Sequence, residues 1–448
     1  MATYPINNSY LLSLDGGGDG LNWSLYNFKR KKLKFLENSS SFYKNNKLII
    51  HDSPADIYSN TTKFLGFRRL RDEGKIMGLS AAGTPIYLDY FSSILNFKNG
   101  RFISKFGGQK RNIRQKIKNI FNFIIYGQNF DFAQISDMKI HLKNYSSKED
   151  VSASLQRSTE LITDKFFNYL SKKYKFKNEK ILLSGGFFSN VLINQKIKNR
   201  HDIKNVYVTP NMGDGGLVLG GIYLAVNKNY KQKYFNKIST NVFYGNKPKK
   251  FFPKMNLKKY KTIQLNSSKL YDYLSDCLIK NKIIGIINDR MEFGPRALGN
   301  RSILANPLKK NITNILNERL KRSDFMPFAP IFRDIDAYKI LEKYNKYDFS
   351  SKFMTITYCV KKEFSKKLKN IIHLDNTVRA QIVDKKNNKL CYSILSSFYK
   401  KTKMPCLINT SFNIHEEPIV MDIDQGIKAL DKGVIDIIVN ENLIITNI

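Results

Sequence analysis

The chain is poor in the residues that most often build metal sites and covalent active sites. Its 448 residues include only five histidines and four cysteines (Cys277, Cys359, Cys391 and Cys406), and no CxxC, HxxH or HExxH pair occurs. No zinc motif is therefore recognisable, and no GxSxG sequence marks a serine nucleophile. Widely spaced cysteines of this kind are typical of reduced, buried thiols in a cytoplasmic protein.

Long apolar runs are absent, and acidic residues are few. No run of about 18 apolar residues predicts a membrane span, and the first residues do not resemble a signal peptide. Lysine and arginine number 75 against 37 acidic residues, giving a formal net charge of +38. Because the lysines are dispersed, we do not expect nucleic-acid binding as the main role. Anionic small substrates fit this charge equally well.

The length and the pattern of apolar segments indicate an α/β protein of more than one domain. A chain of 448 residues exceeds one ordinary core. Apolar strands that end in glycine-containing turns, followed by helical segments, are typical of α/β folds. The stretch 241–262 is basic and contains prolines, and we interpret it as a linker between domains at 1–240 and 263–448.

Three arginines and two glycines alternate with apolar residues between Arg290 and Pro307. Arginine presents planar, bidentate donors suited to phosphate or carboxylate, and glycine lets backbone N–H groups approach an anion closely. We interpret the segment as an anion-binding loop that follows the strand 283–287. The alternative is a surface turn with incidental arginines.

Two glycine-rich turns in the first half could also hold anions. The strand 10–15 ends in Asp15-Gly-Gly-Gly, and the strand 180–184 ends in Gly185-Gly186 before a helix that begins near Asn190. An ordinary glycine-rich hairpin explains the first turn as well. Asp214 lies in a Gly-Asp-Gly-Gly turn, where it would either bind a metal or cap the turn.

Two polar segments in the second half could complete a site with the arginine loop. His373, Arg379 and Gln381 belong to a run of alternating polar residues that would face one side of a strand. The segment Asn409–Asn413 carries four short polar side chains after a strand. The alternatives are a core histidine for His373 and a helix N-cap for Asn409–Asn413.

These motifs, in this order, resemble the O-carbamoyltransferases of the nodulation-protein and antibiotic-tailoring type. The resemblance runs from about residue 10 to 445 and rests on the following segments: Asp15-Gly-x-Gly-Asp-Gly, Lys75-Ile-Met-Gly-Leu, Ser184-Gly-Gly-x-x-x-Asn190, Gly213-Asp-Gly-Gly, Arg290 to Ala305, Met326-Pro-Phe-Ala-Pro, His373 to Gln381, and Asn409-Thr-Ser-Phe-Asn with Glu417-Pro-Ile-Val. Each motif is modest alone, but the ordered set is specific.

The resemblance implies an ATP-dependent enzyme with two domains. The first would be a partial actin/Hsp70/sugar-kinase-like (Kae1-like) domain that transfers carbamoyl to an acceptor hydroxyl. The second would be a YrdC-like α/β domain that makes carbamoyl-adenylate from carbamoyl phosphate and ATP. The resemblance implies ATP and Mg²⁺ as cofactors, and an iron-type metal, Fe²⁺, at the transfer site.

The same resemblance assigns roles to individual residues. Catalytic roles would fall to Arg296, Arg301, Arg379 and His373. Carbamoyl phosphate and ATP would be held by these together with Arg290, Lys321, Asn409, Thr410, Ser411 and Asn413. The transfer-site nucleotide would be lined by Asp15, Gly16, Gly186 and Asn190, and Asp214 would be a metal ligand.

The sequence departs from the resemblance before its first motif. Related proteins carry a longer segment there, with a histidine-rich metal motif, so we expect a partner chain to supply the missing first lobe. Two alternatives remain open: a nucleotide- or polyanion-binding module that has lost transfer, and a kinase-type phosphotransferase.

Overall fold

The computed structural model describes residues 8–18, 21–30, 32–40, 42–44, 47–49, 53–106, 133–229, 241–249, 259–322 and 327–448. They form two compact units, each of which is treated separately below. The N-terminal unit comprises 6–206 and 212–214, and the C-terminal unit comprises 207–211 and 215–448. Both are α/β, which confirms the predicted class. No helix in the described ranges is long and apolar enough to cross a membrane.

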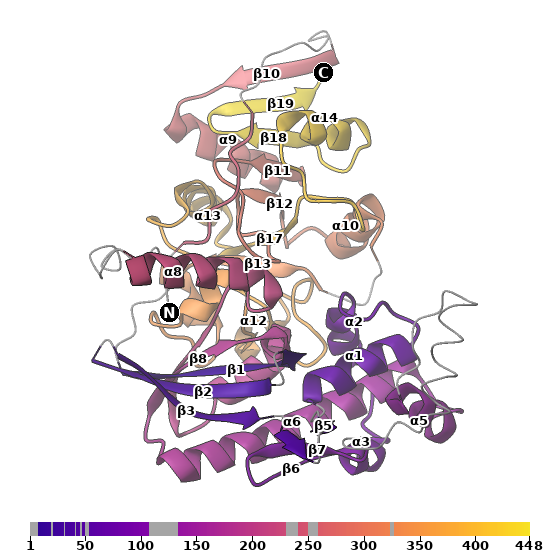
Figure 1. The fold of residues 1–448 in the computed structure, drawn as a ribbon. Helices are drawn as coiled ribbons and strands as arrows, with labels where there is room; N and C mark the ends of the chain where they lie inside the picture. Colours follow the sequence, from indigo (N-terminus) through magenta and orange to yellow (C-terminus); the bar gives the residue numbers. More distant parts are fainter. Residues whose placement is uncertain are drawn as a thin grey trace, which may run out of the picture. The chain divides into compact units, whose positions relative to one another are not determined.

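The N-terminal unit is built on a mixed sheet with the strand order β3-β2-β1-β8-β9 (Figure 1). β1 pairs antiparallel with β2, as the predicted hairpin requires, and parallel with β8. Leu12 and Trp23 are each 1% exposed and belong to the core of the unit. The strands are β1 (Ser9–Gly18), β2 (Leu21–Lys29), β3 (Lys32–Ser40), β8 (Glu179–Ser184) and β9 (Ile203–Val208).

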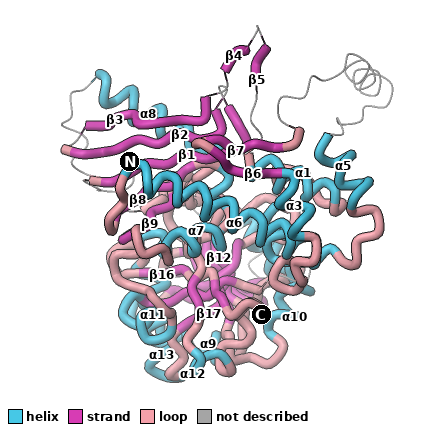
Figure 2. The backbone as a smooth tube through the Cα atoms, turned by 90° about the horizontal axis from the view of Figure 1, so that it is seen from below, coloured by secondary structure: helices cyan, strands magenta, loops and turns pink. Residues whose placement is uncertain are grey.

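Apolar residues recur with helical periodicity over residues 148–173, which predicts a helix there, and the helix α6 (Lys148–Tyr174) packs on this sheet. It begins after Ser147, whose hydroxyl accepts from the Asp150 amide at 3.0 Å. The Phe166 ring packs on Trp23 at a centroid distance of 5.0 Å. Figure 2 shows α6 and α7 on the same side of β1 and β2.

The remaining elements of the N-terminal unit are short. The helices are α1 (Pro54–Phe64), α2 (Glu73–Leu79), α3 (Leu88–Ile94), α5 (Ala133–His141) and α7 (Val191–Lys198), with the 3-10 turns η1 (Gly186–Ser189) and η2 (Asp214–Gly216). Two hairpins are formed by β4 (Phe42–Lys44) with β5 (Lys47–Ile49), and by β6 (Leu95–Lys98) with β7 (Arg101–Ser104).

An eight-stranded sheet with the order β10-β19-β18-β11-β12-β17-β13-β16 forms the C-terminal unit (Figure 1). β12 and β17, both almost wholly buried, lie at its centre as an antiparallel pair. The strands are β10 (Tyr260–Gln264), β11 (Ile284–Ile287), β12 (Arg301–Ala305), β13 (Ala329–Arg333), β16 (Gln381–Val383), β17 (Cys406–Ser411), β18 (Ile437–Asn440) and β19 (Leu443–Asn447). A separate ribbon pairs β14 (Tyr358–Cys359) with β15 (Thr377–Val378).

Helices such as α9, α13 and α14 bury apolar residues in the C-terminal unit. Gly426 lets α14 approach the sheet closely, because a Cβ there would lie 2.6 Å from the Ile287 Cδ1 atom. The helices are α8 (Leu217–Asn229), α9 (Ser267–Ile279), α10 (Ile312–Leu320), α11 (Asp334–Ile340), α12 (Lys362–Ser365), α13 (Lys389–Thr402) and α14 (Ile423–Asp431), with the 3-10 turn η4 (Phe349–Phe353).

The stretch predicted as a linker does not behave as a free linker throughout. Residues 241–249 belong to the C-terminal unit, and Val242 and Asn246 accept hydrogen bonds from the amides of Phe293 and Met291 at 2.7 and 3.0 Å. Tyr260–Gln264 is the edge strand β10. The sequence did not show these contacts because they are backbone pairings between segments about fifty residues apart.

Candidate functional site

The arginine loop closes the antiparallel pair β11–β12, in which Ile287 lies opposite Arg301. Glu292 organises it from within. One carboxylate oxygen, Oε1, accepts from the amides of Leu298 (2.6 Å), Asn300 (2.9 Å) and Arg301 (3.3 Å). The sequence predicted that loop amides would bind an external anion, but these three amides are already satisfied by Glu292. Anion binding therefore depends on the arginine side chains.

Arg301 belongs to the framework of this loop. Its side chain is fully buried, and its guanidinium donates to the carbonyls of Asn288 (2.8 Å), Asn300 (2.8 Å), Asp289 (3.3 Å) and Met421 (3.1 Å). Burial lowers the pKa of Arg301, and the nearby Glu292 carboxylate opposes that shift. Most of its donors are committed to backbone carbonyls, so Arg301 fixes the loop.

Arg290 is exposed at the start of the loop. It donates to the carbonyl of Gly245 at 3.1 Å, which ties the loop to the segment 241–249. Gly245 is packed against Met291, because a Cβ at this position would lie 2.7 Å from the Met291 Cβ. The segment 241–249 thus holds the loop from one side through backbone hydrogen bonds, and Glu292 holds it from within.

Arg296, Arg322 and Arg379 form a cluster of like charges in the C-terminal unit. The pKa of Arg379 is held well below its ordinary value, first by Arg296, then by burial and by Arg322. Burial also lowers the pKa values of Arg296 and Arg322. Within the described part of the chain no carboxylate raises the pKa of any of the three, and the Nε atoms of Arg296 and Arg379 have no hydrogen-bond partner.

Such a cluster is unfavourable unless an anion joins it. Each of the three arginines keeps intermediate exposure, so a small anion can reach them. Guanidinium groups bind phosphate and carboxylate oxygens in pairs. We name Arg296, Arg322 and Arg379 the arginine trio.

Arg322 is a member that sequence reasoning did not assign. Its Nη1 donates to the Thr410 hydroxyl at 3.0 Å, and its guanidinium lies 4.7 Å from the centre of the Phe328 ring. The neighbouring Lys321, which the resemblance nominated, ends α10 in a left-handed conformation and is exposed. The sequence shows two adjacent basic residues, Lys321 and Arg322, but not which of them reaches the site. The position at which α10 ends sets the direction of each side chain.

Asn409 and Gln381 connect the trio to the arginine loop. Asn409 Nδ2 donates to Gln381 Oε1 at 2.5 Å and to the Ala297 carbonyl at 3.3 Å. Gln381 Nε2 donates to the Leu298 carbonyl at 2.8 Å. Both amides are buried, and Asn409 Oδ1 has no partner among the described residues.

His373 lies in a turn instead of the predicted strand. The Asn376 amide donates to the His373 carbonyl and the His373 amide to the Thr377 carbonyl, both at 2.9 Å. Its Nδ1 is 3.5 Å from Asp375 Oδ1, which also accepts from the Thr377 hydroxyl at 2.6 Å. Burial opposes ionisation of Asp375, but these partners lower its pKa. Up to Thr377, the alternating polar residues therefore stabilise a turn and do not line one face of a strand.

The hydrogen bonds and strand pairing of Ser411 and Asn413 do not involve the arginine trio. Ser411 is opposite Ser302 in the β12–β17 pair, and Asn413 Nδ2 donates to the carbonyls of Ile414 and Glu417, both at 2.9 Å. Asn413 lines a cavity of about 210 Å³ between its own loop and α14, beside Lys428. None of the trio lines that cavity.

In the N-terminal unit, Asp15 joins the ends of β1 and β8. Its two carboxylate oxygens accept from the amides of Gly16 (2.7 Å) and Gly186 (2.6 Å). Gly185 has φ +104°, and a Cβ there would lie 2.1 Å from the Leu14 carbonyl oxygen. These close approaches explain why glycines occupy positions 185 and 186. The Asp15 carboxylate fixes the turn by accepting from two backbone amides.

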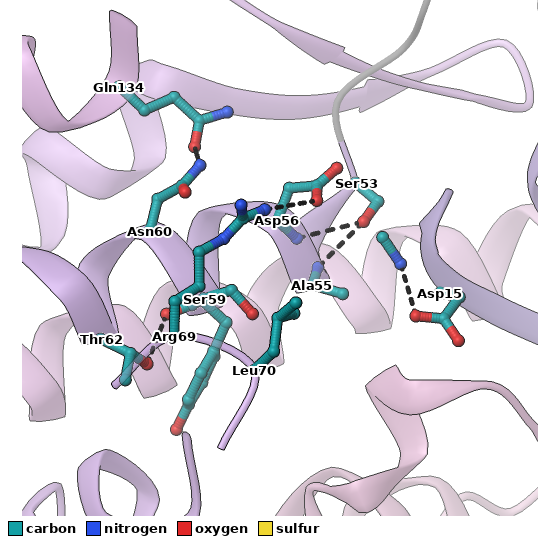
Figure 3. Close-up of polar contacts among 12 residues, drawn as sticks. Asp15, Ser53, Ala55, Asp56, Ser59, Asn60, Thr62, Arg69, Leu70 and Gln134 are labelled. Atoms are coloured by element: carbon teal, nitrogen blue, oxygen red, sulfur yellow. Dashed lines mark hydrogen bonds and ion pairs between the residues drawn. The ribbon is translucent and has the colours of Figure 1, made fainter. Parts of the chain in front are cut away.

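A second carboxylate lies beside this turn. A Cβ on Gly16 would lie 2.8 Å from Asp56 Oδ1, and Asp56 pairs with Arg69 at 3.7 Å (Figure 3). Asp56 is in the first turn of α1, capped by the Ser53 hydroxyl. Sequence reasoning missed Asp56 and Arg69, because neither belongs to a spaced motif.

Asn190 caps α7 by accepting from the Ile193 amide at 3.1 Å, and its Nδ2 donates to Gln156 Oε1 at 2.8 Å. Gln156 also accepts from the Tyr58 hydroxyl at 3.2 Å. Nearby helices carry a further buried polar pair, Asn60 and Gln134, at 2.5 Å (Figure 3). The N-terminal unit therefore contains an internal polar layer that includes Asn190.

Comparison with known proteins agrees with this two-unit arrangement. Residues 2–222 match the family described as Carbamoyltransferase N-terminus, and residues 275–447 match Carbamoyltransferase C-terminus. An uncharacterised protein of Methanocaldococcus jannaschii is 32% identical over 98% of this chain and 79% of its own length. The chain belongs to the carbamoyltransferase family.

Two further carbamoyltransferase relatives carry functional names. Nodulation protein NolO of Bradyrhizobium diazoefficiens is 28% identical over 84% of this chain and 66% of its own length. The 3'-hydroxymethylcephem-O-carbamoyltransferase of Amycolatopsis lactamdurans is 31% identical over 38% of this chain and 32% of its own length. The chain thus spans less than two thirds of the length of several relatives that it matches.

Within the described ranges, Asp214 lies apart from other carboxylate, histidine or cysteine side chains that could share an ion with it. Asp214 is exposed at the start of η2. Across the described ranges, no group of three histidine, cysteine, aspartate or glutamate residues is placed to hold an ion. A metal at Asp214 therefore stays a prediction, and it would need ligands beyond this one carboxylate.

Proposed function

We propose that this chain forms carbamoyl-adenylate from carbamoyl phosphate and ATP and takes part in transfer of the carbamoyl group to an acceptor hydroxyl. The observation that carries the proposal is the arginine trio, whose positive charges have no carboxylate partner in the described ranges. Both substrates present phosphate groups, which this cluster suits.

Each member of the trio has a binding role in the proposal. Arg296, Arg322 and Arg379 neutralise phosphate oxygens and hold the two substrates in one orientation. Glu292 and Arg301 keep the backbone beside Arg296 rigid through the hydrogen bonds described above. Overall, water cleaves carbamoyl phosphate into carbamate and phosphate, and a carbamate oxygen then attacks the α-phosphorus of ATP, which forms carbamoyl-adenylate and releases pyrophosphate.

The finer fold assignments are part of the same proposal. The mixed order β3-β2-β1-β8-β9, with β1 parallel to β8, supports a Kae1-like half-domain in the N-terminal unit. The mixed eight-stranded sheet supports a YrdC-like domain in the C-terminal unit. The turn at Asp15 and Gly186 and the polar layer around Asn190 are the segments that we assign to the transfer step.

A test of the activation step is pyrophosphate exchange into ATP that depends on carbamoyl phosphate. The wild-type chain should catalyse exchange, and Arg296→Ala should lower kcat/KM by about a hundredfold, the loss expected for one charged group at a phosphate. Folded wild-type protein that binds neither pyrophosphate nor ATP would contradict the proposal. Release of ADP instead of AMP would favour the kinase-type alternative.

A binding module without transfer is the second candidate, because the described residues lack a metal-ligand set. It predicts binding of ATP or pyrophosphate without carbamoylated product, even with a panel of hydroxyl acceptors and added Fe²⁺ or Mg²⁺. Detection of a carbamoylated acceptor by mass spectrometry would exclude this candidate.

A further inference from the structure

We infer that Asn409 is the residue by which the arginine site distinguishes a carbamoyl group from other acyl groups. The inference rests on the proposed function, because it concerns the acyl phosphate that the trio would hold. It names the atom involved: Oδ1 of Asn409 accepts a hydrogen bond from the amide N–H of the carbamoyl group.

The orientation of the Asn409 amide is fixed by a chain of two hydrogen bonds. The Leu298 carbonyl can only accept, so the group of Gln381 that faces it at 2.8 Å is the donor Nε2. Gln381 Oε1 is therefore the atom that faces Asn409 at 2.5 Å. Because this oxygen can only accept, the Asn409 atom that contacts it is the donor Nδ2. A flipped Asn409 would place its oxygen against Gln381 Oε1.

A second acceptor supports the same orientation. The Ala297 carbonyl accepts from Asn409 Nδ2 at 3.3 Å. With both donor hydrogens directed at carbonyl oxygens, the amide oxygen is the only group of Asn409 that can contact something else. Both fixed carbonyls, of Ala297 and Leu298, belong to the loop that Glu292 holds rigid.

Asn409 Oδ1 is buried and accepts no hydrogen bond from any residue in the described ranges. Buried acceptors almost always have a donor, so an unpaired one in a candidate site points to a ligand that brings a donor. Asn409 is 1% exposed, and its side chain bonds both to Gln381 and to the arginine loop. It precedes Thr410, which contacts Arg322, and it bonds to Ala297, which follows Arg296.

The ligand that fits has an anionic end for the arginines and an N–H donor close to it. Carbamoyl phosphate has this arrangement, since its amino group is attached to the carbonyl carbon that carries the phosphate. Acetyl phosphate has nearly the same shape and the same charge, but a methyl group replaces the amino group. The structure therefore predicts that the site prefers carbamoyl phosphate over acetyl phosphate, and that Asn409 causes the preference.

The experiment measures dissociation constants of the full chain for carbamoyl phosphate, acetyl phosphate and pyrophosphate by titration calorimetry. Wild-type protein should bind carbamoyl phosphate at least about tenfold more tightly than acetyl phosphate, the effect expected of one buried hydrogen bond. In Asn409→Leu this ratio should fall to within about threefold, whereas the pyrophosphate affinity should stay within about threefold of wild type.

A second variant tests the orientation without altering Asn409. Gln381→Met removes the acceptor that fixes the Asn409 amide, so the preference should fall in the same way. It also keeps the inference testable if Asn409→Leu does not fold. Asn370→Leu is the matched control, because Asn370 also donates to backbone carbonyls (Pro307 at 2.8 Å, Lys309 at 3.3 Å). That control should keep the wild-type preference.

Two outcomes would overturn the inference. An unchanged ratio in both Asn409→Leu and Gln381→Met would show that Asn409 does not select the acyl group. Equal loss of all three ligands in these variants would show that Asn409 only supports the fold. Failure of the proposed function is a different result: Arg379→Met would then bind pyrophosphate as tightly as wild type.

Discussion

Arg296 is the largest single cause that holds the pKa of Arg379 well below its ordinary value. Two arginines so placed repel each other, and Arg322 adds to the repulsion. An arginine does not release its proton readily, so the unfavourable energy is relieved when an anion binds. The pair is therefore a site that the free chain maintains at the expense of stability.

Arg379→Met should raise the stability of the chain and abolish anion binding. We expect the free energy of unfolding to rise by about 1–2 kcal/mol, because one of three repelling, partly buried charges is replaced by an apolar side chain. Chemical denaturation without and with pyrophosphate measures both effects. Wild type at about 100 times Kd should gain about 2.7 kcal/mol, and the variant should gain nothing.

Arg301→Met is the matched comparison, since Arg301 is also a buried arginine of the same unit. Its four carbonyl partners would lose their donors, so this variant should be destabilised by about 3 kcal/mol or more. Stability changes of opposite sign in the two variants would separate a ligand-binding arginine from a framework arginine. A stabilised Arg301→Met would contradict the assignment.

Glu292→Ala should destabilise the chain by about 2–4 kcal/mol, because three loop amides lose their shared acceptor. Glu292→Gln keeps an acceptor oxygen and should cost less than half as much. Thermal and denaturant unfolding of both variants check the prediction. Glu342→Gln, at an exposed position of the same unit, should stay within about 0.5 kcal/mol of wild type.

Gly185→Ala should be one of the most destabilising single substitutions in the N-terminal unit. Its φ of +104° disfavours a side chain, and a Cβ would lie 2.1 Å from the Leu14 carbonyl oxygen, so we expect a loss of about 3 kcal/mol or more. Gly74→Ala is the control. It lies in α2 with open space around it, and it should stabilise by about 0.5–1 kcal/mol. Similar effects of the two changes in denaturant unfolding would argue against the turn geometry.

The turn at His373 should lose stability in acid through Asp375. The pKa of Asp375 is lowered in the folded chain, so its ionised form binds protons less readily than in the unfolded chain. Its contribution is present above the ordinary value of 3.8 and is lost as pH falls from there through the lowered pKa. Asp375→Asn should flatten this part of the stability–pH curve, measured by denaturant unfolding between pH 5 and the acid limit of folding. An unchanged slope would show that other carboxylates dominate.

Local sequence patterns located most elements and the arginine loop itself. Periodic apolar residues predicted α6, and the strands at Tyr10, Lys180 and Ile283 follow from short apolar runs before glycine turns. The roles of individual arginines did not follow. Register places Arg301 opposite the buried Ile287, so it points into the framework. Arg290 remains at the surface.

The sequence alone determined that the chain is α/β and that an arginine-rich loop follows a buried strand. These conclusions depend on nearest-neighbour chemistry and periodicity, which the linear order records. Only the tertiary structure decided which charges meet. It brought Arg296, Arg322 and Arg379 together, gave the loop amides to Glu292, and left Asn409 Oδ1 unpaired. The reason is physical: sheet register and helix ends fix side-chain direction, and both are set by contacts between distant segments.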